Sequence, residues 1–156
     1  MRPEKRFFAA SVLAAIAAAS CAAPSSHEHA AAQADARVAV HFPDELRRHT
    51  LANMRDHLAT LQAIEQALAR GEYDRAAEIS EHRLGLSSLE LHGAHDVAQY
   101  MPAGMQDIGT GMHKAASRFS IAAANAGANG DVRSALDALS AVTAQCVACH
   151  AAYRLD

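Results

Sequence analysis

Two cysteines and a histidine lie close together near the end of this 156-residue chain, in the stretch CVACHAAYRLD. Cys146 and Cys149 are three residues apart, and His150 follows directly. Thiol and imidazole groups at this spacing serve three chemistries, which are a redox disulfide, half of a zinc site and the covalent attachment of haem. The surrounding sequence discriminates among the three.

The pattern CxxCH favours haem attachment over the other two chemistries. A redox site of the thioredoxin kind needs a strand that leads into a helix, and no segment of the chain shows the alternation typical of a strand. A zinc site needs four ligands, and the chain has no second cysteine pair to complete one. In c-type haem, two thioethers hold the porphyrin and the adjacent histidine binds the iron. We therefore expect haem c on Cys146 and Cys149, with His150 as the proximal iron ligand.

Residues 1–20 have the features of a secretion signal. A short basic segment precedes the apolar run FFAASVLAAIAAAS, which is too short to span a bilayer as a mature helix. Cys21 follows directly, and the sequence AASC resembles a bacterial lipobox, in which this cysteine is lipidated. Ordinary cleavage close to this point is the alternative. In both cases we expect export to the periplasm, and in the first case a membrane-anchored lipoprotein.

The small and polar residues of 21–41 are typical of a flexible tether. His27 and His29 are candidates for weak metal binding, although a solvated linker explains them better. If Cys21 is lipidated or lies at a frayed terminus, Cys146 and Cys149 remain as a pair, which removes the anomaly of an odd cysteine in an oxidising compartment. The folded domain is expected over residues 42–156.

Four amphipathic helices are expected in this domain. The first starts at Pro43 and ends at Gly71, the second covers about 73–91, the third opens near Pro102, and the fourth runs from Asp131 to Tyr153. The apolar positions recur at intervals of three and four residues: Leu51, Met54, Leu58, Leu61, Ile64 and Leu68; Ala76, Ile79, Leu84, Leu86 and Leu89; Met105, Ile108, Met112, Ala116, Phe119, Ala123 and Ala126; Val132, Leu136, Leu139, Val142, Cys146, Cys149 and Tyr153. This pattern predicts an all-α fold, an antiparallel up-down-up-down four-helix bundle.

The CxxCH motif belongs to the apolar face of the fourth helix. Residues three and four apart share one face of a helix, so Cys146, Cys149 and His150 are expected to project together into the bundle. Aromatic residues make up only 4% of the chain and tryptophan is absent. A prosthetic group would therefore add to an otherwise thin core.

The ending CVACHAAYR, on the last helix of a four-helix bundle, resembles the class II c-type cytochromes, the cytochrome c′ group. The resemblance covers roughly residues 42–156, with a specific C-terminal motif and a match in pattern only for the first three helices. It implies thioethers at Cys146 and Cys149 and iron ligation by His150. Tyr153 and Arg154 match the family's ending, and Arg154 would contact a haem propionate or shield the haem edge. A cation that stabilises the helix dipole explains Arg154 equally well.

The resemblance also implies that the first helix, ELRRHTLANMRDHLATL, provides the residue on the other side of the iron. Met54 is the first candidate, because a thioether gives the low-spin, six-coordinate iron of electron carriers. Leu51, four residues after Arg47, matches the apolar distal position of high-spin members that bind small gases. In that case Met54 is a core residue. His57 is the third candidate and would give ligation by two histidines.

A further group of possible metal ligands surrounds the second break and the third helix. It consists of His92, His95, Met101, Met105, Met112 and His113. Imidazole and thioether are the ligand types of copper sites. The spacing matches no known motif, so a solvated loop and a methionine-containing core explain these residues better.

The composition excludes some classes of function. The net charge of −3 and the lack of a basic patch argue against nucleic-acid binding. No pairing of nucleophile and base predicts an enzyme. The leading expectation is an exported haem protein that carries single electrons between transient redox partners. The alternatives are a five-coordinate haem that binds nitric oxide or carbon monoxide, and a haem-free metal-binding helical bundle. Homodimerisation, which is common in the family, is expected through the first two helices.

Overall fold

The computed structural model describes residues 35–156, and this part of the chain is mostly helical. Its helices are α1 (Asp44–Ala69), α2 (Tyr73–Arg83), the 3-10 helix η1 (Leu86–Ser88), α3 (Ala94–Ala98), α4 (Ala103–Asn129) and α5 (Val132–Ala152). Two short strands, β1 (Val38–Val40) and β2 (Tyr153–Leu155), flank the helices. The predicted all-α class is confirmed. The expected signal sequence, Cys21, His27 and His29 lie outside the described residues.

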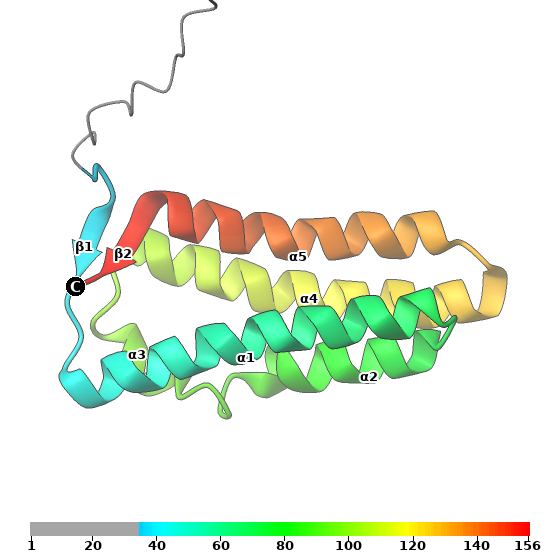
Figure 1. Cartoon of the computed structure of the whole chain (residues 1–156), viewed down its shortest axis with the longest axis horizontal. Helices are drawn as coiled ribbons and strands as arrows, with labels where there is room; N and C mark the ends of the chain where they lie inside the picture. Colours follow the sequence, from blue (N-terminus) through cyan, green and yellow to red (C-terminus); the bar gives the residue numbers. More distant parts are fainter. Residues whose placement is uncertain (1–34) are drawn as a thin grey trace, which may run out of the picture. The chain divides into compact units, whose positions relative to one another are not determined.

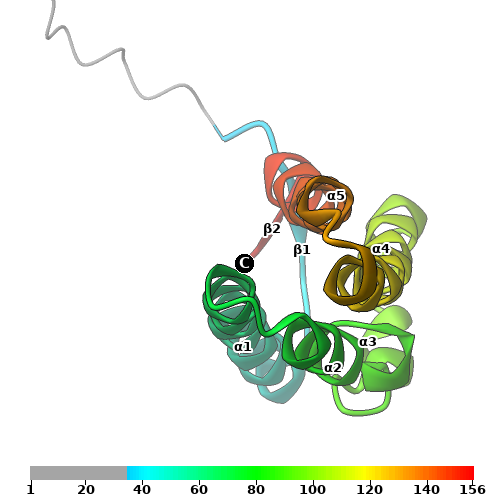
Figure 2. The same ribbon diagram turned by 90° about the vertical axis from the view of Figure 1, so that its right-hand side faces the viewer.

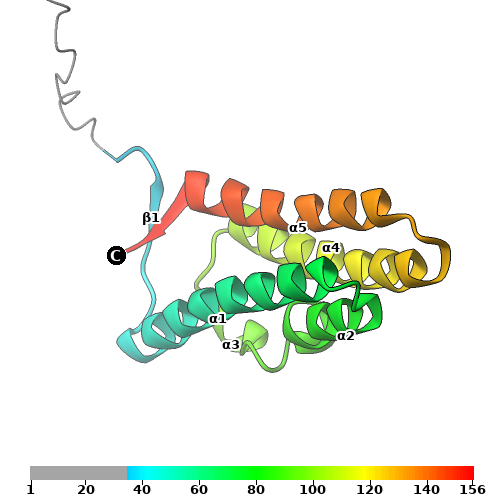
Figure 3. The same cartoon turned by 45° about the vertical axis from the view of Figure 1, so that its right-hand side comes forward.

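Helix α4 packs against both α2 and α5, and α2 packs against α1. Figure 2 shows these four long helices end on, beside one another. The segment that connects α2 to α4 carries η1 and α3, and α3 contacts α1. In Figures 1 and 3 the last turns of α5 and the first turns of α1 lie at the same end of the helices. The CxxCH motif and the predicted distal residues are therefore brought to one end of the domain.

The ends of the helices follow the signals that the sequence contains. Pro43 precedes α1, and Asp44 and Glu45 in its first turn favour the positive end of the helix dipole. Gly71 and Gly130 have φ angles of 73° and 77°, a left-handed conformation that glycine adopts without steric cost, and they end α1 and α4. The Asp131 side chain accepts a hydrogen bond from the Ser134 backbone N–H at 3.2 Å and caps α5, as predicted.

The main core lies between the four long helices and is built largely from small side chains. Phe119, Ile64 and Leu84 are its largest fully buried residues, and alanines fill much of the rest. The predicted stripe of α4 is confirmed at five positions, which are Met112, Ala116, Phe119, Ala123 and Ala126. Among the described helices, α5 is long and apolar enough to cross a membrane, judged by length and composition alone. Its buried residues pack into this core.

Three leucines that were expected in the core lie on the surface. Leu58 is 70% exposed, Leu136 is 53% exposed and Leu86, in the turn after α2, is 43% exposed. One residue corresponds to about 100° around a helix, so the burial of Ala135 turns Leu136 away from the core. Likewise the face that turns Ile64 inward leaves Leu58 outside. The stripes were correct at Ile64, Leu68, Leu139 and Val142, which are buried, and wrong at Leu58 and Leu136. In α5 the small side chain of Ala135 takes the core position, because alanine allows close packing.

The second helix is shorter than predicted. It ends at Arg83 rather than near residue 91, because Gly85 and two serines build a different turn there. The Ser88 hydroxyl donates to the Gly85 carbonyl at 2.7 Å, and the Ser87 hydroxyl donates to the Glu81 carbonyl at 2.8 Å. These side-chain hydrogen bonds compete with continued helix. The expected loop over 92–102 contains α3.

The expectation that the chain has no strands was wrong for two three-residue segments. Strands β1 and β2 pair in parallel, with Val38 opposite Tyr153 and Val40 opposite Leu155. Strand β1 falls within the stretch expected as a tether, and β2 takes Tyr153 out of the helix in which it was predicted. Strand pairing at such short segments leaves almost no periodic signal in the sequence.

A second, smaller apolar cluster lies under these strands. Val40, Phe42 and Met105 are buried in it, and Cys149 and Tyr153 pack against it. The cluster fixes the end of α5 between the N-terminal strand and the start of α4, so the CxxCH motif is held from both sides.

Candidate functional site

The two cysteines of the CxxCH motif lie on the last turns of α5. Cys146 packs against the main core and Cys149 against the smaller cluster. Both are free thiols, and burial raises the pKa of each. They are therefore protonated at neutral pH and available for thioether formation.

A cavity of about 290 Å³ opens beside this motif, and we call it the C-terminal cavity. It brings Cys149 and His150 of α5 together with Leu51 and Met54 of α1, almost one hundred residues earlier in the chain. The other residues that line it are Arg37, Arg47, Thr50, Met105, Tyr153, Arg154 and Leu155. Cys146 does not line the cavity. The structure thus unites most of the site residues that the sequence predicts for a haem.

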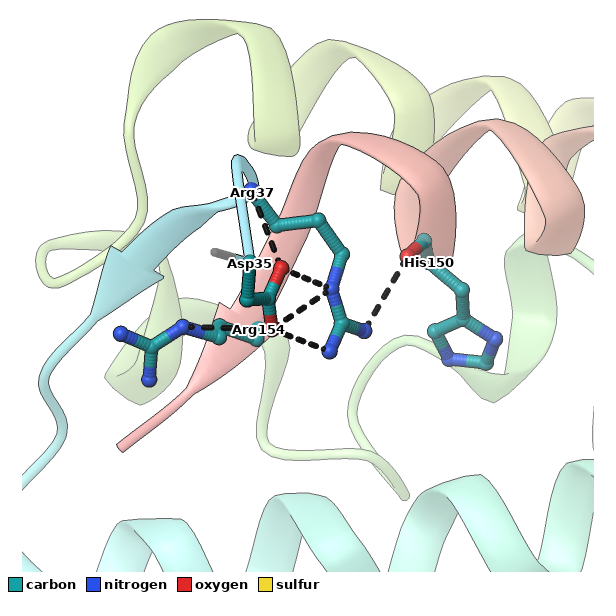
Figure 4. A network of polar contacts seen from close by, with 4 residues as sticks. All are labelled: Asp35, Arg37, His150 and Arg154. Carbon is teal, nitrogen blue, oxygen red and sulfur yellow. Dashed lines mark hydrogen bonds and ion pairs between the residues drawn. The ribbon is translucent and has the colours of Figure 1, made fainter. Parts of the chain in front are cut away.

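The side chain of His150 is exposed and free to turn. Figure 4 shows its imidazole extending from α5 on the side where α1 passes. Its backbone carbonyl accepts a hydrogen bond from Nη1 of Arg37 at 3.3 Å. This contact joins the segment before β1 to the motif. The two ring nitrogens of His150 have no hydrogen-bond partner in the described part of the chain.

Three arginines surround the C-terminal cavity. Figure 4 shows two of them beside Asp35: Arg37 forms an ion pair with this carboxylate at 2.7 Å, and Nε of Arg154 lies 3.6 Å from it. The third, Arg47, donates a hydrogen bond to the main-chain oxygen of Asp156 at 2.9 Å. The Arg37 guanidinium lowers the pKa of Asp35 to about 2. Arg37, Arg47 and Arg154 line the cavity, whereas Asp35 and Asp156 lie beside them outside its lining. We call these three arginines the positive rim, and their guanidinium donors suit acidic groups. Arg37 was not predicted as a site residue, because it falls in the stretch expected as a tether.

A second cavity of about 170 Å³ adjoins the first, and we call it the histidine cavity. Thr50 and Met54 line both cavities. The histidine cavity brings together His57 of α1, His92 of the connecting segment and His113 of α4. The distances between ring centroids are 4.6 Å for His57–His92, 5.4 Å for His92–His113 and 6.4 Å for His57–His113.

A hydrogen bond defines which ring nitrogen of His113 carries a proton. Nδ1 of His113 lies 2.8 Å from the carbonyl oxygen of Leu84, which can only accept, so this nitrogen donates. Nδ1 of His92 lies 3.4 Å from the Ser88 hydroxyl, whose own proton goes to the Gly85 carbonyl. The Nε2 atoms of His57 and His92 are buried and have no hydrogen-bond partner in the described part of the chain.

The three imidazoles are neutral at pH 7. Burial lowers the pKa of His57 to about 4, with a further contribution from repulsion by the other two histidines. Burial also lowers the pKa of His92 and His113. Asp56 lies near this cluster but forms an ion pair with Arg83, so their charges largely offset each other.

The histidines and methionines that were weighed as possible copper ligands are divided by the structure. His92, His113, Met101 and Met112 line the histidine cavity, whereas His95 is exposed and Met105 lines the C-terminal cavity. The interpretation of His92 as part of a solvated loop was wrong, because this residue is only 6% exposed. His57 lines the histidine cavity and not the C-terminal cavity.

In the conformation described for residues 35–156, no group of three or more His, Cys, Asp or Glu side chains is arranged to hold a metal ion. Comparison with known proteins found no matching protein-family model, no matching curated protein and no matching solved structure. The functional interpretation therefore rests on the motif and on the two cavities.

Proposed function

We propose that the protein is an exported c-type haem protein, similar to the class II cytochromes, that carries single electrons between redox partners. The observation that supports this proposal is the C-terminal cavity, where Cys149 and His150 meet Leu51 and Met54. In the proposal, Cys146 and Cys149 hold the haem through thioethers and His150 binds the iron. The four long helices would form the antiparallel four-helix bundle of that family.

When bound, a c-type haem would supply one-electron exchange at its iron. The chain would contribute the apolar surroundings that exclude water, through Leu51, Met105 and Tyr153. Arg37, Arg47 and Arg154 would hold the acidic propionates at the rim, where charge-assisted hydrogen bonds are strong. The same exposed edge would meet a redox partner.

Met54 is the distal ligand in this proposal. Among the described residues, the Met54 thioether is the only soft donor from α1 in the lining of the C-terminal cavity. It belongs to the α1 wall of this cavity, whereas the motif belongs to the α5 wall. His57 is less suitable, because it lines the neighbouring cavity. Leu51 lines the C-terminal cavity as well, and this supports the second candidate function, a five-coordinate haem that binds nitric oxide or carbon monoxide.

Absorption spectra of the purified ferric and ferrous protein would test the proposal and its alternative. We expect a low-spin spectrum that becomes high-spin in Met54→Leu. Met105→Leu is the matched control, since Met105 lines the same cavity from α4, and it should stay low-spin. A high-spin spectrum in the unchanged protein supports the gas-binding alternative. A polypeptide that keeps no haem after denaturation contradicts both functions and supports a haem-free metal-binding protein.

Export and anchoring are part of the same proposal. Residues 1–20 would direct the chain to the periplasm, and Cys21 would carry a lipid that tethers the domain to the membrane. Replacement of Cys21 by Ser should move the protein from the membrane fraction to the soluble periplasmic fraction. An unchanged distribution contradicts lipidation and leaves the haem proposal intact.

Analytical ultracentrifugation would test whether two chains associate through α1 and α2.

A further inference from the structure

The histidine cavity contains groups that the proposed haem attachment does not use. His57, His92 and His113 come from α1, the connecting segment and α4, which are far apart in the sequence. His92 and His113 are only 6% and 7% exposed. Three imidazoles collected in one buried place need a physical explanation, because histidine is rarely buried without a partner.

The unpartnered nitrogens point to a ligand. Nε2 of His57 and Nε2 of His92 are buried without a hydrogen bond in the described part of the chain, and both residues line the histidine cavity. A buried polar atom without a partner destabilises the fold, because it has lost its hydrogen bonds to water and gained none in return. Such atoms in native proteins call for a bound water, ion or other ligand. Two of them in one cavity of about 170 Å³ indicate a common occupant.

The outer hydrogen bonds are those of metal-binding histidines. Nδ1 of His113 donates to the Leu84 carbonyl at 2.8 Å, and Nδ1 of His92 faces the Ser88 hydroxyl at 3.4 Å. In metal sites the ring nitrogen that does not bind the ion commonly donates in this way, which fixes the ring and its tautomer. In His113, Nε2 is left with its lone pair, which is the form that binds a metal, and donation from Nδ1 of His92 to Ser88 would give that residue the same form.

The spacing of the rings is close to that of a shared ion. Three imidazoles bound tetrahedrally at a metal–nitrogen distance of about 2.0–2.1 Å place their ring centroids roughly 5 Å apart. The observed centroid distances are 4.6, 5.4 and 6.4 Å. The three rings do not point their nitrogens at one position, so metal binding requires them to rotate. The largest rotation is expected for His57, because its Nε2 makes no hydrogen bond.

The other residues of the cavity indicate which ion fits. The thioethers of Met54, Met101 and Met112 line it, and no Asp, Glu, Lys or Arg of the described part does so. Imidazole combined with thioether favours copper(I) over harder ions. A neutral donor set in a buried place also favours a single positive charge, since the cost of burying an ion rises steeply with its charge.

We propose that His57, His92 and His113 bind one copper(I) ion in the histidine cavity, with a methionine thioether as the fourth ligand. The site is separate from the haem site, and the inference goes beyond the proposed electron transfer. Met54 is assigned to the C-terminal cavity, so Met101 and Met112 are the candidates for the thioether.

Anaerobic titration of the purified full-length protein with copper(I), in competition with a coloured copper(I) chelator, would test the site. We expect the protein to withhold one copper(I) per chain. His92→Gln and His113→Gln should each weaken the binding at least tenfold. His95→Gln is the matched control, because this exposed histidine lies on α3 close to His92 and lines neither cavity; its binding should stay within twofold.

Several outcomes would overturn the proposal. These are no copper withheld, an equal loss in His95→Gln, or tighter binding of zinc(II) than of copper(I). If His57→Gln changes the haem spectrum but not the copper affinity, His57 is an iron ligand and the proposed site is wrong.

X-ray absorption of the copper-loaded, unchanged protein keeps the test valid if the histidine variants fail to fold. We expect scattering from imidazole nitrogens and one sulfur. The sulfur contribution should disappear in Met101→Leu or in Met112→Leu, and it should persist in Met105→Leu, whose side chain lines the other cavity. A spectrum without imidazole scattering would place the copper elsewhere and refute the site, and one without sulfur would refute the thioether ligand.

Discussion

The C-terminal cavity and the histidine cavity share the side chains of Thr50 and Met54 but differ in almost every other respect. The first is ringed by three arginines and contains a contiguous CxxCH motif. The second has no charged Asp, Glu, Lys or Arg in its described lining, and its three histidines come from separate segments. A site with a local motif is visible in the sequence, whereas a site assembled from distant segments is visible only after folding.

The largest expected effect concerns the separation of the two sites. The double replacement Cys146→Ala and Cys149→Ala should abolish covalent haem, because thioethers need both sulfurs. Haem staining after denaturing electrophoresis measures the loss. The same variant should keep copper(I) affinity within threefold in the chelator competition. Loss of copper binding in a variant with native helical content would show that the two cavities form one site.

The next effect is a pH dependence that arises in the histidine cavity. His57 has a pKa of about 4 in the folded protein and about 6.5 when unfolded, so the unfolded state binds the proton first as the pH falls. The stabilising contribution is complete above pH 6.5 and is lost between about 6.5 and 4. For the metal-free protein we expect a loss of about 1–3 kcal/mol in the free energy of unfolding, measured by urea denaturation.

The control for this pH dependence is a pair of variants. His57→Gln should reduce the slope between pH 6.5 and 4, with His92 and His113 accounting for the remainder, while His95→Gln should keep it. An unchanged slope in His57→Gln would mean that His57 is not a source of the acid sensitivity.

A smaller effect is expected from Gly104, which directly precedes the cavity-lining Met105 in α4. A Cβ added at Gly104 would lie 2.6 Å from the Tyr153 hydroxyl, so the tyrosine must move. Gly104→Ala should destabilise the protein by about 1 kcal/mol, despite the gain in helix propensity. Gly109→Ala, in the same helix with nothing within 4 Å, should instead stabilise it by about 0.5–1 kcal/mol. Thermal unfolding followed by circular dichroism compares the two, and equal shifts would contradict the packing of Tyr153.

The smallest effect is expected from the positive rim. A cation close to the haem favours the reduced iron, so Arg37→Gln should lower the reduction potential slightly. The shift should shrink at high salt, because the guanidinium is exposed and screened. Arg75→Gln, on the exposed face of α2, is the control and should leave the potential unchanged. A rise in the potential of Arg37→Gln would show that this residue acts through structure rather than through its charge.

The sequence predicted much of the scaffold, since local signals determine helices. The capping of α5 by Asp131, the end of α4 at Gly130 and the buried face of α4 were all predictable. The exposed positions of Leu58 and Leu136 were not, because a stripe rich in alanine leaves its orientation ambiguous by one residue.

The motif CVACHAAYR allows c-type haem attachment to be predicted from the sequence alone, because that attachment needs two thiols and an imidazole within five residues, and the attachment stays a prediction. Only the tertiary structure decided that Leu51 and Met54 line the same cavity as this motif and that Arg37 does so too. It also decided that His57 lies in the other cavity, with His92 and His113. These contacts join segments that are far apart in the chain, and their geometry depends on how helix faces pack, which no local pattern contains.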